Sequence, residues 1–194
     1  MTAESSARPN WGRLFEVAVG QEGYFTTEQA AQVGYSAQLL VHYVRSGKVI
    51  RVRRGVYRLV HYPASEHDDL IVVWLWSAHE GVFSHQTALA LHGLSDVLPA
   101  RLHLTLPMKW RHRRLRTPPG VVLHFADVHD AERSWFGAVP VTIPSRTIID
   151  CVATHVSPEL LQQAVQQAIS RGLLTQEDAA ELQRVTKAFS GSVA

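Results

Sequence analysis

The chain has 194 residues, of which 46% are hydrophobic, and its formal net charge is +2 at pH 7. This length and composition allow one large domain or two small ones, and the single cysteine, Cys151, excludes an intrachain disulfide framework and a cysteine-rich zinc site. The longest apolar run, residues 70–76, is too short to span a bilayer, and residues 1–30 lack the apolar region of a signal peptide. We therefore expect a soluble cytoplasmic protein with no membrane partner.

The small net charge hides a strong segregation of charge along the chain. Residues 1–60 carry 8 basic and 4 acidic groups, whereas residues 61–108 carry 1 and 5. Residues 109–116, KWRHRRLR, add 5 basic groups and no acidic ones. Such blocks favour contact with a polyanion at two places along the chain.

The first sixty residues follow the order of a winged helix-turn-helix. An amphipathic helix is expected over residues 10–19, and Thr26 is placed to cap the next helix in a capping box with Gln29. Gly34 supplies a left-handed stop, after which a second helix runs from Ser36 to Gly47. A basic hairpin over residues 50–59 completes the module, with its turn at Arg54-Gly55.

Two surfaces of this module are expected to meet DNA. Burial of the apolar stripe on the 36–46 helix leaves Gln38, His42 and Arg45 together on the opposite face, where they can contact base edges. In the hairpin, alternation predicts one packed side that includes Ile50 and Val52 and one basic side that meets phosphate. The full set of expected DNA-binding residues is Thr27, Ser36, Gln38, His42, Arg45, Lys48, Arg51, Arg53, Arg54 and Arg58.

The remaining chain predicts a second, α+β domain. Residues 61–65 form the expected linker, so the predicted domains are 8–62 and 66–189. A helix over 66–79 is apolar nearly all round and should be the central helix of the second domain. A short helix capped by Ser84 follows, and three strands at 102–107, 121–128 and 138–142 predict a small mixed sheet. Helices over 145–155, 158–171 and 176–189 end the pattern, the last capped by Thr175.

Together these segments resemble the AbiEi-type antitoxin family over residues 10–185. The most specific parts are Ala88–Gly93 with Leu94, the strand that ends at Pro107, and Arg146-Thr147 with Asp150. The resemblance implies a bacterial toxin-antitoxin protein whose N-terminal module binds its own promoter, and whose C-terminal domain opposes a nucleotidyltransferase-like toxin encoded beside it. Longer members of the family continue past the last helix, and a function of that extra region is not expected here.

Eleven histidines raise the question of a metal site. His85 with His92, or His124 with His129, could converge. The first pair, in a short helix, has no carboxylate at ligand spacing, and Asp127 and Asp130 near His129 are expected in a solvent-exposed surface turn. The chain has no HExxH or CxxC motif. Clustered carboxylates with a lysine, a phosphate-binding loop and a nucleophile elbow are also missing from the sequence. We therefore expect no metal ligand, no cofactor and no catalytic residue.

A second basic surface is expected to contact the partner or additional nucleic acid. Arg146 and Asp150 lie four residues apart, so an ordinary intrahelical ion pair competes with a role for Arg146 in partner contact. The expected members of this surface are Lys109, Arg111, Arg113, Arg114, Arg116 and Arg146.

The sequence thus predicts an autorepressing antitoxin with operator DNA and a cognate toxin as its partners. Two alternatives remain at this point. One is a stand-alone winged-helix regulator whose second domain dimerises or senses a ligand, and the other is a nucleic-acid-processing enzyme.

Overall fold

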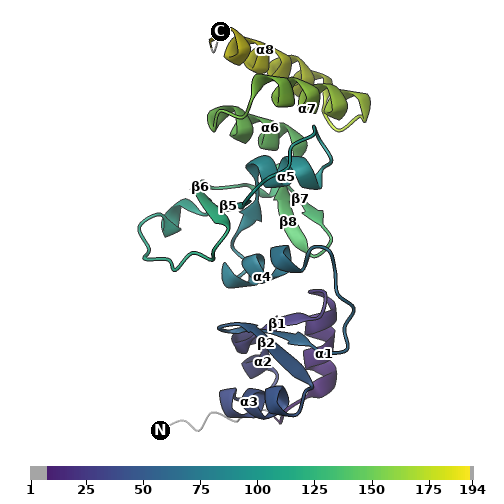
Figure 1. The fold of residues 1–194 in the computed structure, drawn as a ribbon, viewed down its shortest axis with the longest axis vertical. Coiled ribbons are helices and arrows are strands. Elements are labelled where there is room, and N and C mark those ends of the chain that lie inside the picture. The colour runs from purple at the N-terminus through teal and green to yellow at the C-terminus, as the bar shows by residue number, and fades with distance from the viewer. Residues whose placement is uncertain (1–7, 193–194) are drawn as a thin grey trace. The chain divides into compact units, whose positions relative to one another are not determined.

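The computed structural model of the chain describes residues 8–192 (Figure 1). They form two compact units, the first ending at His79 and the second beginning at Glu80. Both units combine helices with a sheet, so the fold class is α+β, as predicted. Every described helix falls short of the length and apolarity needed to cross a lipid bilayer.

The first unit is a winged helix-turn-helix followed by one further helix. Its elements in chain order are α1 (Trp11–Val19), β1 (Tyr24–Thr26), α2 (Thr27–Gln32), α3 (Ala37–Arg45), β2 (Val49–Arg53), β3 (Val56–Leu59) and α4 (Asp68–Trp76). In the described part of this unit the strands form an antiparallel sheet in the order β1-β3-β2. Its core includes Leu14, Phe25, Ala30, Leu40, Val49 and Leu59, one from each of α1, β1, α2, α3, β2 and β3.

Local signals in the sequence set the boundaries of α2 and α3. The side chain of Thr26 accepts from the backbone of Gln29, whose own side chain accepts from the backbone of Thr26, so the predicted capping box is confirmed. Gly34 and Gly47 have φ of 90° and 70° at the ends of α2 and α3, as a left-handed stop requires.

The helix α4 differs from its expected place in the second domain. It is buried along Leu70–Leu75, as its apolar sequence predicted, but it packs on β1 and β3 of the first unit. His79, just after it, also hydrogen-bonds to Gln21 (2.9 Å). These contacts place the boundary between the compact units after His79 and not at the expected linker near Pro63.

The second unit is a mixed sheet with helices. Its elements are β4 (Val82–Phe83), α5 (His85–Leu91), β5 (Leu102–Leu106), η1 (Met108–Trp110), β6 (Val121–Phe125), η2 (Asp130–Glu132), β7 (Arg133–Phe136), β8 (Val139–Thr142), α6 (Pro144–Ala153), α7 (Pro158–Ser170) and α8 (Gln176–Ser192). The described strands are ordered β6-β5-β4-β8-β7, with parallel pairs β5·β6 and β4·β8. Helices α5 to α8 share one apolar core around Leu89, Ile148, Leu161 and Leu182.

Two details of the second unit differ from the sequence predictions. The strands β4 and β7 were not predicted, because one has two residues and the other alternates exposed and half-buried positions. Ser84 precedes α5, but its side chain makes no capping bond and instead contacts Thr105 Oγ1 (2.7 Å) and His85 Nδ1 (2.8 Å).

Candidate nucleic-acid interface

The second helix of the helix-turn-helix, α3, presents a polar face. Its start is fixed by Ser36, whose hydroxyl accepts from the backbone of Leu39 (3.2 Å). Leu40 is fully buried in the core, which turns Gln38, His42 and Arg45 outward, where all three are exposed. This is the face that the sequence singled out for contact with base edges.

A cluster of aromatic side chains fixes the rotation of α3 about its own axis. Tyr43 stacks on Trp11 of α1 (5.4 Å between ring centroids) and packs edge-on against the buried Tyr35 (5.4 Å). The Lys48 ammonium lies over the Tyr43 ring (5.2 Å), and Lys48 is an exposed residue. Because Tyr43 is held on three sides, the direction of the exposed face is set by packing within the module.

The wing is formed by β2 and β3, but its register differs from the predicted alternation. Ile50 pairs with Arg58, and Arg51 pairs with Tyr57, so each arginine shares a sheet face with an apolar residue. The pairing shifts between Arg51 and Arg53, as at a β-bulge. The prediction that Ile50 and Val52 pack inward is therefore wrong, and both are about two-fifths exposed.

The wing arginines divide into outward and inward groups. Arg51 and Arg54 are exposed and Arg53 is half-buried, whereas Arg58 turns back onto the module. Arg58 donates to the Tyr62 carbonyl (2.9 Å) and lies over the Tyr24 ring (5.6 Å). We therefore leave Arg58 out of the candidate interface.

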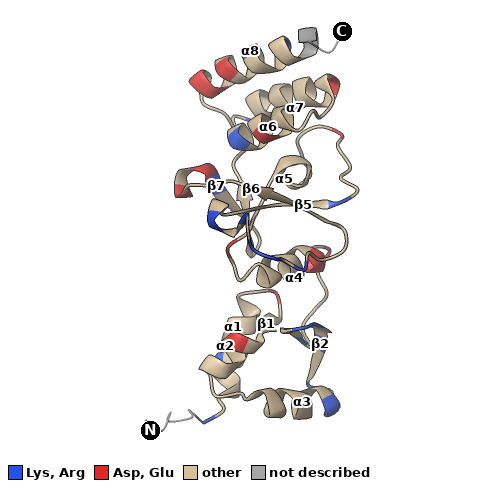
Figure 2. Ribbon diagram, turned by 90° about the vertical axis from the view of Figure 1, so that its left-hand side faces the viewer, with Lys and Arg blue, Asp and Glu red and all other residues tan. Residues whose placement is uncertain are grey.

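Thr27 links the helix-turn-helix to the tip of the wing. Its backbone N–H donates to the Gly55 carbonyl (2.9 Å), and Gly55 has φ of 80° in the turn after Arg54. Figure 2 shows basic residues at the end of α3 and on β2, the two elements that this module would present to a nucleic acid. The interface therefore offers polar side chains from α3 and cationic side chains from the wing.

This region matches a known family. Residues 13–60 match the family described as transcriptional regulators of the AbiEi antitoxin type. The predicted resemblance is confirmed for this N-terminal segment, which contains α3 and the wing, and the family is described as one of regulators.

Comparison with whole proteins adds little. A crystal structure of the RV2827C protein from Mycobacterium tuberculosis is 17% identical over 97% of this chain and 84% of its own, with a TM-score of 0.46. A likeness this low transfers no function to the present chain. No curated protein matches the sequence.

Outside residues 13–60, the side chains of the basic segment 109–116 are partly engaged in contacts within the second unit. Lys109 pairs with Glu80 (3.0 Å), and the Arg113 guanidinium lies over the buried Trp110 ring (4.5 Å). The exposed members of the segment are Lys109, Arg111, Arg113, Arg114 and Arg116.

Arg146 is held within the second unit. Its guanidinium pairs with Asp150 (2.9 Å) and with Glu132 (2.6 Å), and its side chain is 19% exposed. The intrahelical ion pair between Arg146 and Asp150 that the sequence suggested is therefore present, and Glu132 of η2 adds a second carboxylate to it. Because both carboxylates occupy it, we do not include Arg146 in a partner surface.

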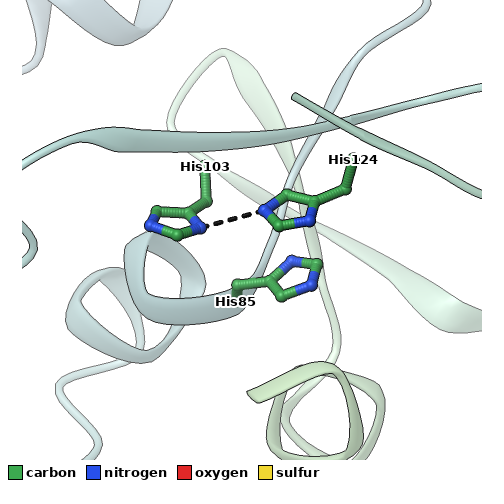
Figure 3. A group of neighbouring side chains, drawn as sticks. All are labelled: His85, His103 and His124. Carbon is green, nitrogen blue, oxygen red and sulfur yellow. Dashed lines mark hydrogen bonds between the residues drawn. The ribbon is translucent and has the colours of Figure 1, made fainter. Parts of the chain in front are cut away.

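Three histidines meet in the second unit, although the sequence suggested different pairs. One ring nitrogen from each of His85, His103 and His124 lies within 4.8 Å of the other two (Figure 3). His92 instead donates to the Thr142 carbonyl (2.7 Å), and His129 lies in the turn before η2. The signal that sequence reasoning missed is the pairing of β5 with β6, which sets Thr105 beside His124.

Burial lowers the basicity of all three imidazoles. Burial lowers the pKa of His85 to about 3, with smaller contributions from His124 and His103. Burial and then His103 lower the pKa of His124 to about 4, and burial lowers the pKa of His103. The cluster is therefore uncharged near neutral pH.

Proposed function

We propose that this protein is a DNA-binding antitoxin that represses its own promoter, acts in the cytoplasm and opposes a nucleotidyltransferase-like toxin. The observation that carries the DNA-binding part is the joint exposure of Gln38, His42 and Arg45 on α3 beside Arg51 and Arg54 on the wing. All five lie within the segment that matches the regulator family.

The geometry supports a division of labour within this interface. A helix of this kind enters the major groove, where amide and guanidinium groups contact base edges, and wing cations contact flanking phosphates. From Arg45 to Arg58 the sequence has six Lys or Arg and no Asp or Glu, so a polyanion meets no opposing charge from this stretch.

Footprinting of the DNA upstream of the protein's own gene tests autorepression. We expect protection of a site there at protein concentrations that leave unrelated DNA unprotected. A promoter-reporter fusion should show lower expression when the protein is supplied. Equal, weak binding to all DNA would contradict autorepression while leaving non-specific DNA binding intact.

We propose that the second unit acts against the toxin. The exposed basic groups of residues 109–116 can attract an acidic partner by charge. If a nucleotidyltransferase-like toxin encoded beside the gene stops cell growth, co-expression of the full-length chain should restore growth. Failure to restore growth would contradict the antitoxin function and leave the DNA-binding function untouched.

A second candidate is a winged-helix regulator whose second unit senses a ligand. It is favoured by a pocket of about 350 Å³ in that unit, lined among others by His85, His124, Arg111 and Asp150. Repression without growth rescue would favour this function over that of an antitoxin.

A further inference from the structure

The sheet of the second unit brings two histidines to one face. In the parallel pair β5·β6, His103 lies opposite Val122 and Thr105 lies opposite His124. Residues paired in this way point to the same face, and so do residues two apart on one strand. His103, Thr105 and His124 therefore share one side of the sheet.

The third histidine comes from the helix that follows β4. His85 is the first residue of α5 and is 6% exposed, with its ring stacked on that of His124 (3.6 Å between centroids). Its φ of 52° is a left-handed conformation that few residues other than glycine adopt. Such a conformation persists only where the surrounding structure holds it.

A hydroxyl chain orients the His85 ring. Its Nδ1 contacts Ser84 Oγ (2.8 Å), which in turn contacts Thr105 Oγ1 (2.7 Å), and both hydroxyl groups are buried. With Nδ1 engaged in this way, Nε2 is left to bind another group. Histidine ligands of metal ions are oriented by this kind of bond from the second ring nitrogen.

The spacing between the other two rings suits a shared ion. His103 Nδ1 and His124 Nε2 face each other at 3.0 Å (Figure 3). Two nitrogen ligands of a tetrahedral zinc ion, each about 2.0–2.1 Å from the metal, lie roughly 3.3 Å apart. Small rotations of these two rings would direct both nitrogens at one point, and one ring nitrogen of His85 lies within 4.8 Å of each of them.

We propose that His85, His103 and His124 bind a divalent transition metal ion of the zinc class. Three neutral imidazoles favour zinc, copper, nickel or cobalt over magnesium or calcium, which prefer oxygen ligands. His85 and His124 also line the pocket of about 350 Å³, so a fourth ligand, either water or a small molecule, can reach the ion from there.

An anion site is the competing reading of the same pocket. Two arginines also line it: Arg146 is already paired with Asp150 and Glu132, and Arg111 is exposed to solvent. An uncharged imidazole cluster attracts anions weakly. The chemistry of three converging imidazole nitrogens fits a cation better than an anion.

The test is metal titration of the full-length chain, produced without a histidine tag and freed of metal by a chelator. We expect one Zn²⁺ or Co²⁺ per chain, a visible Co²⁺ spectrum typical of tetrahedral coordination, and no binding of Mg²⁺. His103→Gln and His124→Gln should abolish stoichiometric binding, and Ser84→Ala should weaken it by about 10- to 100-fold through loss of ring orientation.

The matched controls are His112→Gln and His129→Gln, which remove exposed histidines of the same unit and should bind as the wild type does. Circular dichroism without metal establishes that each variant is folded. His103 and His124 are both half-buried, so either variant keeps the test decisive if the other fails to fold. Wild-type protein without stoichiometric binding, or folded His103→Gln protein with unchanged binding, would overturn the proposal.

Discussion

At the scale of the residue, the wing arginines differ in what their guanidinium groups already contact. Arg51 and Arg54 reach solvent, while Arg58 is committed to the Tyr62 carbonyl and the Tyr24 ring. A phosphate can replace water around the first two. It would have to displace protein contacts around the third, so we expect these residues to respond differently to substitution.

Substitution of Arg51 and Arg54 by alanine should weaken DNA binding mainly at low salt. Each lost phosphate contact reduces the slope of log K against log salt by about 0.9, so the double variant should lose up to about 2 units of slope. Fluorescence anisotropy at several salt concentrations measures it. Arg58→Ala is the control: it should lower the free energy of unfolding by about 1 kcal/mol through its lost hydrogen bond. An unchanged slope in the double variant would contradict the wing interface.

Gln38→Ala should reduce discrimination between DNA sequences. Because Gln38 lies on the exposed face of α3, it can form a bidentate contact with a base, and loss of such a contact removes about 1–3 kcal/mol of discrimination. Binding to operator DNA should fall while binding to random DNA stays the same. Competition titrations measure this ratio, and an equal loss on both DNAs would assign Gln38 to backbone positioning.

The free energy of unfolding should fall in mild acid because of the half-buried His92. Burial lowers its pKa, the nearby Arg171 lowers it further, and its bond to the Thr142 carbonyl opposes both effects. As the pH falls below about 6.5, the ordinary pKa of histidine, the unfolded chain binds a proton that the folded chain resists, so stability falls with pH. Urea unfolding at pH 7.5 and 5.5 should show this drop, and His92→Asn should reduce it. The same drop in the variant would exclude His92 as its source.

At the scale of the element, α6 is anchored through a single cation. Arg146 joins Asp150 on α6 to Glu132 on η2, and its removal leaves a largely buried Asp150 without its partner. The pKa of Asp150 is already raised by burial, against the effect of Arg146. Arg146 therefore stabilises a largely buried Asp150 carboxylate whose charged form burial alone would disfavour.

Arg146→Ala should lower the free energy of unfolding by about 2–3 kcal/mol, the range for stranding a charged hydrogen-bonding group. Arg146→Ala combined with Asp150→Asn should recover part of this loss, because a neutral amide is less costly to bury. Urea unfolding of both variants measures the difference. If the cost of the double change equals the sum of the costs of Arg146→Ala and Asp150→Asn measured singly, the two residues are not coupled.

Elements with strong local signals could be predicted from the sequence, and pairings between distant strands could not. The capping box at Thr26, the glycine stops and Pro158 mark helix ends within a few residues of the structure. The shift between Arg51 and Arg53 follows from the wing's pairing, which no local pattern encodes. The histidine cluster depends on the pairing of β5 with β6, which the sequence does not show. The sequence analysis therefore paired His85 with His92 and His124 with His129, whereas the structure groups His85, His103 and His124.

At the scale of the whole molecule, the boundary after His79 changes how the chain should be divided. A fragment of residues 1–79 keeps α4 on β1 and β3 and the bond between His79 and Gln21, whereas a fragment of residues 1–65 loses both. We expect the longer fragment to unfold at a higher temperature, by roughly 4–8 °C for each kcal/mol that these contacts contribute. Thermal unfolding by circular dichroism measures the two midpoints, and equal midpoints would show that α4 adds no stability to this unit.

The connection between β5 and β6 gives the second unit room to change during evolution. Residues 107–120 have to return only the length of a five-residue strand, about 17 Å, yet their contour reaches roughly 50 Å. Doubling the length of such a connection adds only about 0.6 kcal/mol of closure entropy. Insertions and changes of charge can therefore accumulate in this basic segment while the paired strands stay in register. Related chains can in this way diverge in the partner they attract without having to evolve a new sheet.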